Sequence, residues 1–176
     1  GIDEEGAWVT PFVMHPEDHN TLFAGFVNLW RSTNAGNQWE QLTGFTGSKK
    51  LQHICVSPSN HDVIYIGTYS NLYRTTNNGE TWSRLNAPVD LAMSDLEVHF
   101  NNSDILWVTV SGFSPDKKVY KSVDGGQNWS NITDNLPNIP ANTICCREFS
   151  PDRIYVGMES GIYYRDKYDD NWTKAA

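Results

Sequence analysis

A motif that ends in tryptophan recurs four times along this 176-residue chain, and its spacing limits the folds open to the sequence. The four tryptophans stand at positions 39, 82, 129 and 172, so the spacings are 43, 47 and 43 residues. Each one ends a segment that begins with an aliphatic residue, and these segments are 29–39, 72–82, 119–129 and 162–172. A period of this length is typical of a protein built from repeated units of supersecondary structure.

Short apolar runs precede the motif in every repeat. One set follows a cluster of turn-forming residues and lies at 22–25, 64–67, 106–109 and 154–157. A further set lies upstream, at 12–15, 54–56, 96–100 and 144–146. The runs lack a helical period and are rich in β-branched and aromatic residues, so they predict strands. In the second repeat we expect four strands, at 52–57, 63–69, 71–76 and 81–85.

Four strands in each repeat of 43 to 47 residues is the pattern of a β-propeller. We predict an all-β chain of four four-stranded antiparallel blades, with approximate limits of 8–42, 51–85, 95–132 and 142–174. The whole of 1–176 would form one segment of a larger propeller, because an open arc of blades leaves apolar faces uncovered at both ends.

The residue types in the motif suit a tight turn between the third and fourth strands of a blade. An Asp or Asn side chain accepts hydrogen bonds from nearby amides, a glycine supplies a positive φ, and the tryptophan packs over the turn. The three well-formed copies comprise Ser32, Asn34, Gly36 and Trp39; Thr75, Asn77, Gly79 and Trp82; and Ser122, Asp124, Gly126 and Trp129. The fourth copy keeps only Trp172, because Arg165, Lys167 and Asp169 occupy its other positions. We therefore expect the fourth turn to lack the hydrogen bonds of the motif.

These copies resemble the Asp-box, or BNR, repeat of β-propellers, and the resemblance extends from about Trp8 to Trp172. The sequences of the repeats are most similar to those of sortilin-like propellers in long, modular, secreted bacterial proteins. The resemblance implies a secreted or cell-surface protein whose partner is the rest of a larger propeller. It also implies a structural role for the motif, on the face opposite the one that binds ligands. Sialidases, xyloglucanases and sortilin-like receptors share the motif, so it predicts a fold and leaves the activity open.

Composition excludes several classes of partner. The formal net charge is −8 and no basic cluster is present, which argues against nucleic acid and anionic membranes. No apolar stretch approaches the ~18 residues of a membrane span. The chain opens with Gly1 and has no signal-peptide pattern, so we expect processing or truncation there. Cys55, Cys145 and Cys146 lack metal-site spacing and stand in apolar runs, which predicts buried structural thiols, with no metal and no cofactor.

Ligand binding is expected at the end of the blades that carries the second-to-third strand loops and the connections between blades. These connections are 43–50, 86–94 and 133–142, and the third repeat adds an insertion at 111–118. Insertions on one face often carry binding. We assign Phe45, Tyr69, Phe113 and Asp116 as candidate binding residues. Aromatic rings beside polar groups suit a neutral glycan or a protein partner, whereas the acidic chain disfavours anionic glycans.

Catalysis has weaker support in the sequence, and no catalytic residue is assigned. A glycoside hydrolase needs two carboxylates ~5–9.5 Å apart, and Asp90, Asp95, Glu97 and Asp116 are the candidates that could share a face. The Arg-Ile-Pro strand of sialidases is missing, and the five histidines lie in first strands and the turns after them with no nucleophile-elbow motif. The sequence thus favours a non-catalytic extracellular scaffold or binding module. The alternative is a fragment of a sialidase-like or xyloglucanase-like glycoside hydrolase whose catalytic residues lie mostly outside the chain.

Overall fold

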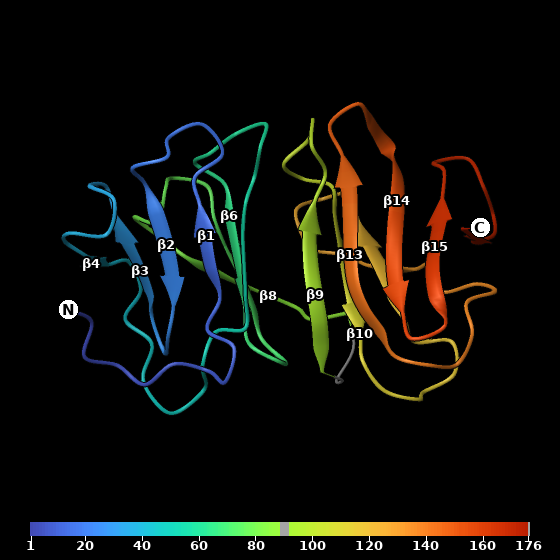
Figure 1. Ribbon diagram of the computed structural model, residues 1–176, viewed down its shortest axis with the longest axis horizontal. Coiled ribbons are helices and arrows are strands. Elements are labelled where there is room, and N and C mark those ends of the chain that lie inside the picture. Colours follow the sequence, from blue (N-terminus) through green and yellow to red (C-terminus); the bar gives the residue numbers. More distant parts are fainter. Residues whose placement is uncertain (89–91, 176) are drawn as a thin grey trace. The chain divides into compact units, whose positions relative to one another are not determined.

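The computed structural model describes residues 1–88 and 92–175, and these form sixteen strands in four antiparallel sheets without a helix (Figure 1). Each sheet joins four strands that follow one another in the chain. The predicted all-β fold of four four-stranded antiparallel sheets is confirmed. No helix in the described residues is long and apolar enough to cross a membrane.

The chain divides into two compact units, Gly1–Leu85 and Asn86–Ala176, each of which contains two sheets. In the first unit the strands are β1 (Phe12–Met14), β2 (Leu22–Gly25), β3 (Leu29–Ser32), β4 (Glu40–Gln41), β5 (His53–Val56), β6 (Ile64–Gly67), β7 (Leu72–Thr75) and β8 (Ser83–Leu85). In the second unit they are β9 (Met93–Val98), β10 (Leu106–Val110), β11 (Val119–Ser122), β12 (Ser130–Asn131), β13 (Ala141–Arg147), β14 (Ser150–Met158), β15 (Gly161–Arg165) and β16 (Thr173–Lys174).

Apolar residues of the repeated runs form a core within each unit. In the first unit Phe23, Leu29, Leu51, Val56, Ile64 and Ile66 cluster together. In the second unit the cluster includes Trp107, Val119, Ile144, Val156 and Trp172. Every residue of β6 and β10 is buried, which explains why these strands read as continuous apolar runs instead of alternating ones.

Three turns between third and fourth strands share one hydrogen-bond pattern. In the first, Ser32 Oγ accepts the Gly36 amide at 2.9 Å and donates to Asn34 Oδ1 at 3.0 Å. Asn34 Oδ1 also accepts the Gln38 amide at 2.8 Å. The same bonds recur with Thr75, Asn77, Gly79 and Thr81, and again with Ser122, Asp124, Gly126 and Asn128.

Two consecutive residues of each of these turns adopt a positive φ. The glycines have φ values of 86° at Gly36, 91° at Gly79 and 87° at Gly126. The residue before each glycine is also left-handed, with φ values of 55° at Ala35, 53° at Asn78 and 71° at Gly125. The sequence analysis anticipated only the glycine. The preceding position was missed because it holds three different residues, alanine, asparagine and glycine, and an alanine gives no sign of the conformation.

The motif tryptophans also join neighbouring segments. Trp82 Nε1 donates to the Leu42 carbonyl at 3.1 Å, and Leu42 directly follows β4 of the other sheet in its unit. Trp129 Nε1 donates to the Asn86 carbonyl at 2.9 Å, and Trp172 Nε1 donates to the Ile132 carbonyl at 2.7 Å. Each acceptor is the first residue after a fourth strand. Among the described residues, Trp39 Nε1 bonds within its own turn, to the Gly36 carbonyl at 3.0 Å.

The fourth turn is held by different bonds. Arg165 Nε donates to the Asp169 carbonyl at 2.8 Å, and Asp169 Oδ2 accepts the Asp166 amide at 3.2 Å. A guanidinium-to-carbonyl bond and an amide-to-carboxylate bond thus replace the hydroxyl and amide bonds of the motif. Trp172 remains in place and is only 3% exposed.

One expectation about the cysteines is wrong. Cys145 is exposed and Cys55 and Cys146 are half-buried, so they do not form the set of buried thiols that the apolar runs suggested. None of the three is in a disulfide. The reason for Cys145 is the alternation of side chains along β13, an edge strand of its sheet, which places Ile144 in the core and the next residue on the other side.

Gly79→Ala should destabilise the first unit by about 1–3 kcal/mol. Its φ of 91° disfavours any side chain, and an added Cβ would lie 3.0 Å from Leu42 Cδ1. Gly44→Ala is the matched control, because Gly44 has no atom within 4 Å of the added Cβ. Urea unfolding followed by tryptophan fluorescence measures both. Equal losses from the two substitutions would contradict the role given to the turn.

Asp124→Asn should reduce the loss of stability in acid. Hydrogen bonds from the Asn128 amide and side chain and from Ser122 lower the pKa of Asp124 from 3.8 to about 2. A lowered pKa stabilises the folded state above pH 3.8, and this contribution disappears as the pH falls toward 2. Asparagine has no such titration and already occupies the position in two copies. Urea midpoints between pH 6 and pH 2 test this, and identical acid dependence in both proteins would refute it.

Candidate functional site

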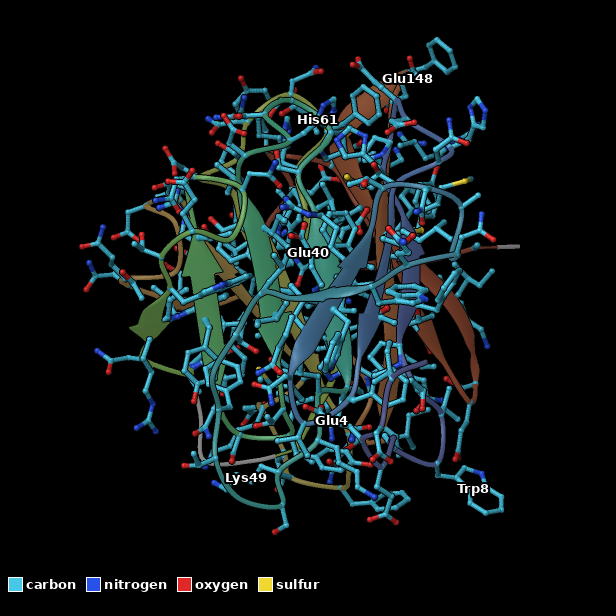
Figure 2. The ribbon with its side chains drawn as sticks, turned by 90° about the vertical axis from the view of Figure 1, so that its left-hand side faces the viewer. Glu4, Trp8, Glu40, Lys49, His61 and Glu148 are labelled. Atoms are coloured by element: carbon cyan, nitrogen blue, oxygen red, sulfur yellow. The ribbon has the colours of Figure 1, made fainter. Side chains whose placement is uncertain are left out.

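One end of the first unit carries the connection after β4 and the turn between β6 and β7. Lys49 of that connection and Glu4 of the N-terminal segment lie at this end, opposite His61 (Figure 2). A cleft of about 530 Å³ lies there, lined by Gly44, Phe45, Thr46, Gly47, Ser48, Lys49, Thr68, Asn71 and Tyr73. An adjoining hollow of about 270 Å³ shares Ser48, Lys49 and Thr68 and adds Tyr69. We call the two together the unit 1 cleft.

Asn28, the residue before β3, fixes the wall of the cleft. Its Oδ1 accepts the Phe45 amide at 2.7 Å and the Thr43 hydroxyl at 2.9 Å. Glu4 holds Asn28 in turn, because its carboxylate accepts the Asn28 amide and the Asn28 Nδ2 group, each at 2.9 Å. Burial alone would raise the pKa of Glu4, but these hydrogen bonds outweigh it and lower the pKa. The start of the connection is thereby rigid, which suits a preformed site.

The aromatic residues of the cleft differ in exposure. The Phe45 ring lies 4.5 Å from the Tyr73 ring between centroids, and both pack against the core of the unit. Tyr69 is 59% exposed at the turn after β6. The opposite wall is polar, since Thr68 Oγ1 accepts the Asn71 amide at 3.0 Å and Asn71 Oδ1 accepts from Arg84 at 3.0 Å. The cleft thus offers an exposed ring beside a row of hydrogen-bonding groups.

Phe113 and Asp116 belong to the second unit, in the loop between β10 and β11. Phe113 is 67% exposed, and Asp116 has a φ of 54° with its carbonyl accepting from Asn131 Nδ2 at 2.6 Å. The buried Lys118 closes the loop, because its Nζ donates to the Gly112 carbonyl at 2.7 Å. The loop is therefore folded on itself and presents its phenylalanine outward.

Sequence reasoning missed the residues that shape these loops. Asn28, Asn71 and Lys118 each stand directly before the third strand of a sheet. Their alignment next to the apolar runs was visible, with asparagine in two copies and lysine in the third, but nothing in the sequence indicated that this position shapes the loops. Tyr73 was also missed, since it reads as an ordinary strand residue.

The carboxylates considered for hydrolysis have structural partners. Asp95 Oδ2 accepts the Thr143 hydroxyl at 2.6 Å and the Ile144 amide at 3.0 Å. Glu97 Oε1 accepts the Cys146 amide at 3.1 Å and its Sγ at 3.3 Å. Both residues therefore bind β9 to β13 of the next sheet. Asp90 lies outside the described residues, and Asp116 is in the loop after β10.

Histidines at the ends of first strands close turns. His15 Nδ1 accepts the amides of Glu17 at 3.2 Å and Asp18 at 3.1 Å. His99 Nδ1 accepts the Asn101 amide at 3.0 Å. Burial lowers the pKa of both histidines, which favours the neutral ring that accepts these bonds. Among the described residues, no group of three or more His, Cys, Asp or Glu side chains is placed to hold a metal ion.

The sequence profile of the Sortilin-Vps10 family, described as sortilin, neurotensin receptor 3, matches residues 27–165. The chain belongs to the Sortilin-Vps10 family. This family assignment confirms the resemblance to sortilin-like Asp-box propellers. No curated protein matches this Sortilin-Vps10 chain in sequence.

Solved structures confirm the β-propeller fold. The GH74 xyloglucanase from Xanthomonas campestris has a TM-score of 0.78 at 17% identity, covering 98% of this chain and 31% of its own. The GH74 enzyme from Niastella koreensis has a TM-score of 0.75 at 19% identity, covering 93% and 29%. YCF48 from Cyanidioschyzon merolae has a TM-score of 0.66 at 14% identity, covering 100% and 58%. The Sortilin-Vps10 chain thus spans less than two thirds of each of these propellers.

Glu97→Gln should stabilise the protein at neutral pH. Burial raises the pKa of Glu97 above 4.5, with a smaller contribution from the charge of Asp95, although the bonds from Cys146 oppose it. A raised pKa gives stability that is complete below pH 4.5 and is lost as the pH rises through the folded-state pKa. Glutamine stays neutral and still offers an oxygen to the Cys146 amide.

Urea midpoints at pH 7 and pH 4 test this expectation. The variant should exceed the unmodified protein at pH 7, and the difference should shrink at pH 4. Glu148→Gln, at an exposed position, is the control for a general change of charge. A Glu97→Gln protein that is less stable at pH 7 would show that the ionised carboxylate is the favoured form.

Proposed function

We propose that this Sortilin-Vps10 chain is a non-catalytic binding segment of an extracellular β-propeller. The observation that supports this most directly is the unit 1 cleft, where Tyr69 is exposed beside Thr68, Asn71 and Ser48. Clefts of a few hundred Å³ with aromatic walls and a few fixed polar groups are typical ligand sites.

The chemistry of the cleft suits a neutral glycan, with a protein segment as the other ligand class. A sugar ring stacks its C–H face on an exposed aromatic ring and directs its hydroxyls to polar neighbours. Asn71 and Ser48 supply both donors and acceptors for hydroxyl groups. Lys49 adds a positive charge, but the formal net charge of −8 disfavours a strongly anionic ligand over the surface as a whole.

Glycoside hydrolysis receives less support. Two GH74 enzymes share the fold, but identities of 17% and 19% carry no information about catalytic residues. Asp95 and Glu97 are bonded to the backbone of β13, so neither carboxylate is held ready for acid or base chemistry. The binding function therefore rests on the cleft alone.

The partner most directly implied is further propeller structure. The GH74 neighbours are about three times as long as the segment that this chain matches. We propose that additional blades accompany this segment, in a secreted or cell-surface protein. Phe113 and Asp116 would supply a second contact surface at the corresponding end of the third sheet.

Binding to neutral polysaccharides tests the proposal. Affinity electrophoresis through gels that contain xyloglucan or another neutral polysaccharide should retard the protein. Tyr69→Ala should weaken the retardation about tenfold, which corresponds to ~1.4 kcal/mol. Because Tyr69 is exposed, this substitution should leave the urea midpoint unchanged.

Phe149→Ala is the matched control, since Phe149 is 88% exposed at the turn between β13 and β14. It should leave binding unchanged. If both substitutions weaken polysaccharide binding equally, the ligand does not bind at the unit 1 cleft and the proposal is wrong. If no neutral polysaccharide binds but a peptide library yields a ligand that is sensitive to Tyr69→Ala, the ligand class is protein.

A further inference from the structure

A second cavity lies within the second unit, lined by residues from the sheet of β10 and β11 and from the sheet of β14 and β15. Its volume is about 120 Å³, and its main lining residues are Trp107, Lys121, Asp152, Arg165, Asp166 and Lys167. A water molecule accounts for ~30 Å³ of liquid, so the cavity has room for roughly four water-sized groups. One tetrahedral oxyanion is of this size.

Residues that replace the motif in the fourth repeat line this cavity. Arg165 stands at the Ser or Thr position of the motif and Lys167 stands at its Asp position. Both line the cavity, whereas the intact turns carry a buried hydroxyl at the first position and a half-buried amide or carboxylate at the second. Lys121 adds a third cation from the neighbouring sheet, where it is the cross-strand partner of Trp107. Its Nζ lies 5.7 Å from the centre of that indole ring.

The negative groups around the cavity are already paired. Asp166 accepts two hydrogen bonds from Arg153, at 2.7 and 2.6 Å. Asp152 lies 3.2 Å from Lys167 Nζ and 3.9 Å from His99 Nε2. Arg165 binds Asp134 outside the cavity. Lys121 forms no ion pair with any residue in 1–88 or 92–175, so the lining keeps one uncompensated positive charge.

Lys121 and Trp107, which both line the cavity, lack a counter-ion and a hydrogen-bond acceptor respectively in the described residues. Burial lowers the pKa of Lys121, and the charges of Lys167 and Arg165 lower it further, while the charge of Asp152 opposes them. Trp107 is 3% exposed, and its Nε1 is a buried donor without an acceptor in the described residues. A buried donor that lacks an acceptor is costly, and a half-buried cation without an ion-pair partner is also disfavoured. An anion in the cavity would supply a counter-ion to Lys121 and an acceptor to the Trp107 indole N–H.

We propose that this cavity binds a small free oxyanion of the phosphate or sulfate type. Lys121, Arg165 and Lys167 supply the charge, and the Trp107 indole forms one wall and offers a donor. The overall negative charge of the chain does not prevent this, because charges beyond ~8 Å are largely screened at physiological ionic strength. The site is separate from the unit 1 cleft and does not depend on the binding function proposed there.

Titration with inorganic phosphate and with sulfate tests the site, with chloride at equal ionic strength as the reference. Phosphate should raise the melting temperature saturably and shift the indole N–H resonance of Trp107 in the NMR spectrum. Trp107→Phe assigns that resonance. Phenyl phosphate should bind at least tenfold more weakly than inorganic phosphate if the site accepts only a free ion. Equal binding of both would mean that the site takes an oxyanion carried on a larger molecule and would overturn the free-ion assignment.

Lys121→Met should weaken phosphate binding at least tenfold. Without phosphate the variant should be as stable as the unmodified protein or more so, because a desolvated and repelled charge is removed. Lys117→Met makes the same charge change at an exposed position of the same unit and should leave phosphate binding intact. A phosphate response that equals the chloride response, or one that both lysine variants retain, would show that the cavity holds only water.

Discussion

The bond from a tryptophan indole to the carbonyl after a fourth strand is the interaction on which each two-sheet unit depends. Trp82 makes it to Leu42 in the first unit, and Trp172 makes it to Ile132 in the second. The indole also covers its own turn, so one side chain fixes the hairpin and joins it to the neighbouring sheet. The positive φ values at Asn78 and Gly79 belong to the intact form of the turn that carries this ring. The exposed fourth strands, two or three residues long, can remain short because their ends are held in this way.

The fourth repeat shows which part of the motif is indispensable. Its hydroxyl, amide and glycine have all been replaced, yet Trp172 is the most buried of the four motif tryptophans and keeps its bond to the Ile132 carbonyl. The turn itself is closed by Arg165 and Asp169 instead. The hairpin of the fourth repeat is closed by a new set of hydrogen bonds, whereas its tryptophan and the bond to the neighbouring carbonyl are retained. The exchanged positions then become available for other chemistry, and here they bring cations to the cavity beside Trp107.

The sequence predicted those features that depend on residues close together in the chain. The strands, the three intact turns and the loss of the fourth were foreseeable because each depends on residues within about ten positions of one another. The partners of Asp95 and Glu97 were not foreseeable, since Thr143 and Cys146 lie almost fifty residues away in the chain. The exposure of Cys145 escaped prediction because an apolar run does not reveal which of its residues faces outward on an edge strand. Of the candidate site, Phe45 and Tyr69 were foreseen as ring-bearing positions, but the support from Asn28 and Glu4 depends on contacts that only folding creates.

The two ends of the blades are therefore under different constraints. At the motif end, hydroxyl, amide, glycine and tryptophan are all committed to the turn. At the other end, a threonine hydroxyl accepts the first amide of the third strand, as Thr43 does for Leu29 and Thr133 does for Val119. The side chain one position earlier is free to vary, and it is asparagine in the first sheet and lysine in the third. Asn28 pulls the connection at 43–45 inward, whereas Lys118 ties down the insertion through the Gly112 carbonyl. One variable position on a fixed frame thus shapes the loops of the first and third sheets, so the loops at this end can differ while the joints between the sheets stay intact.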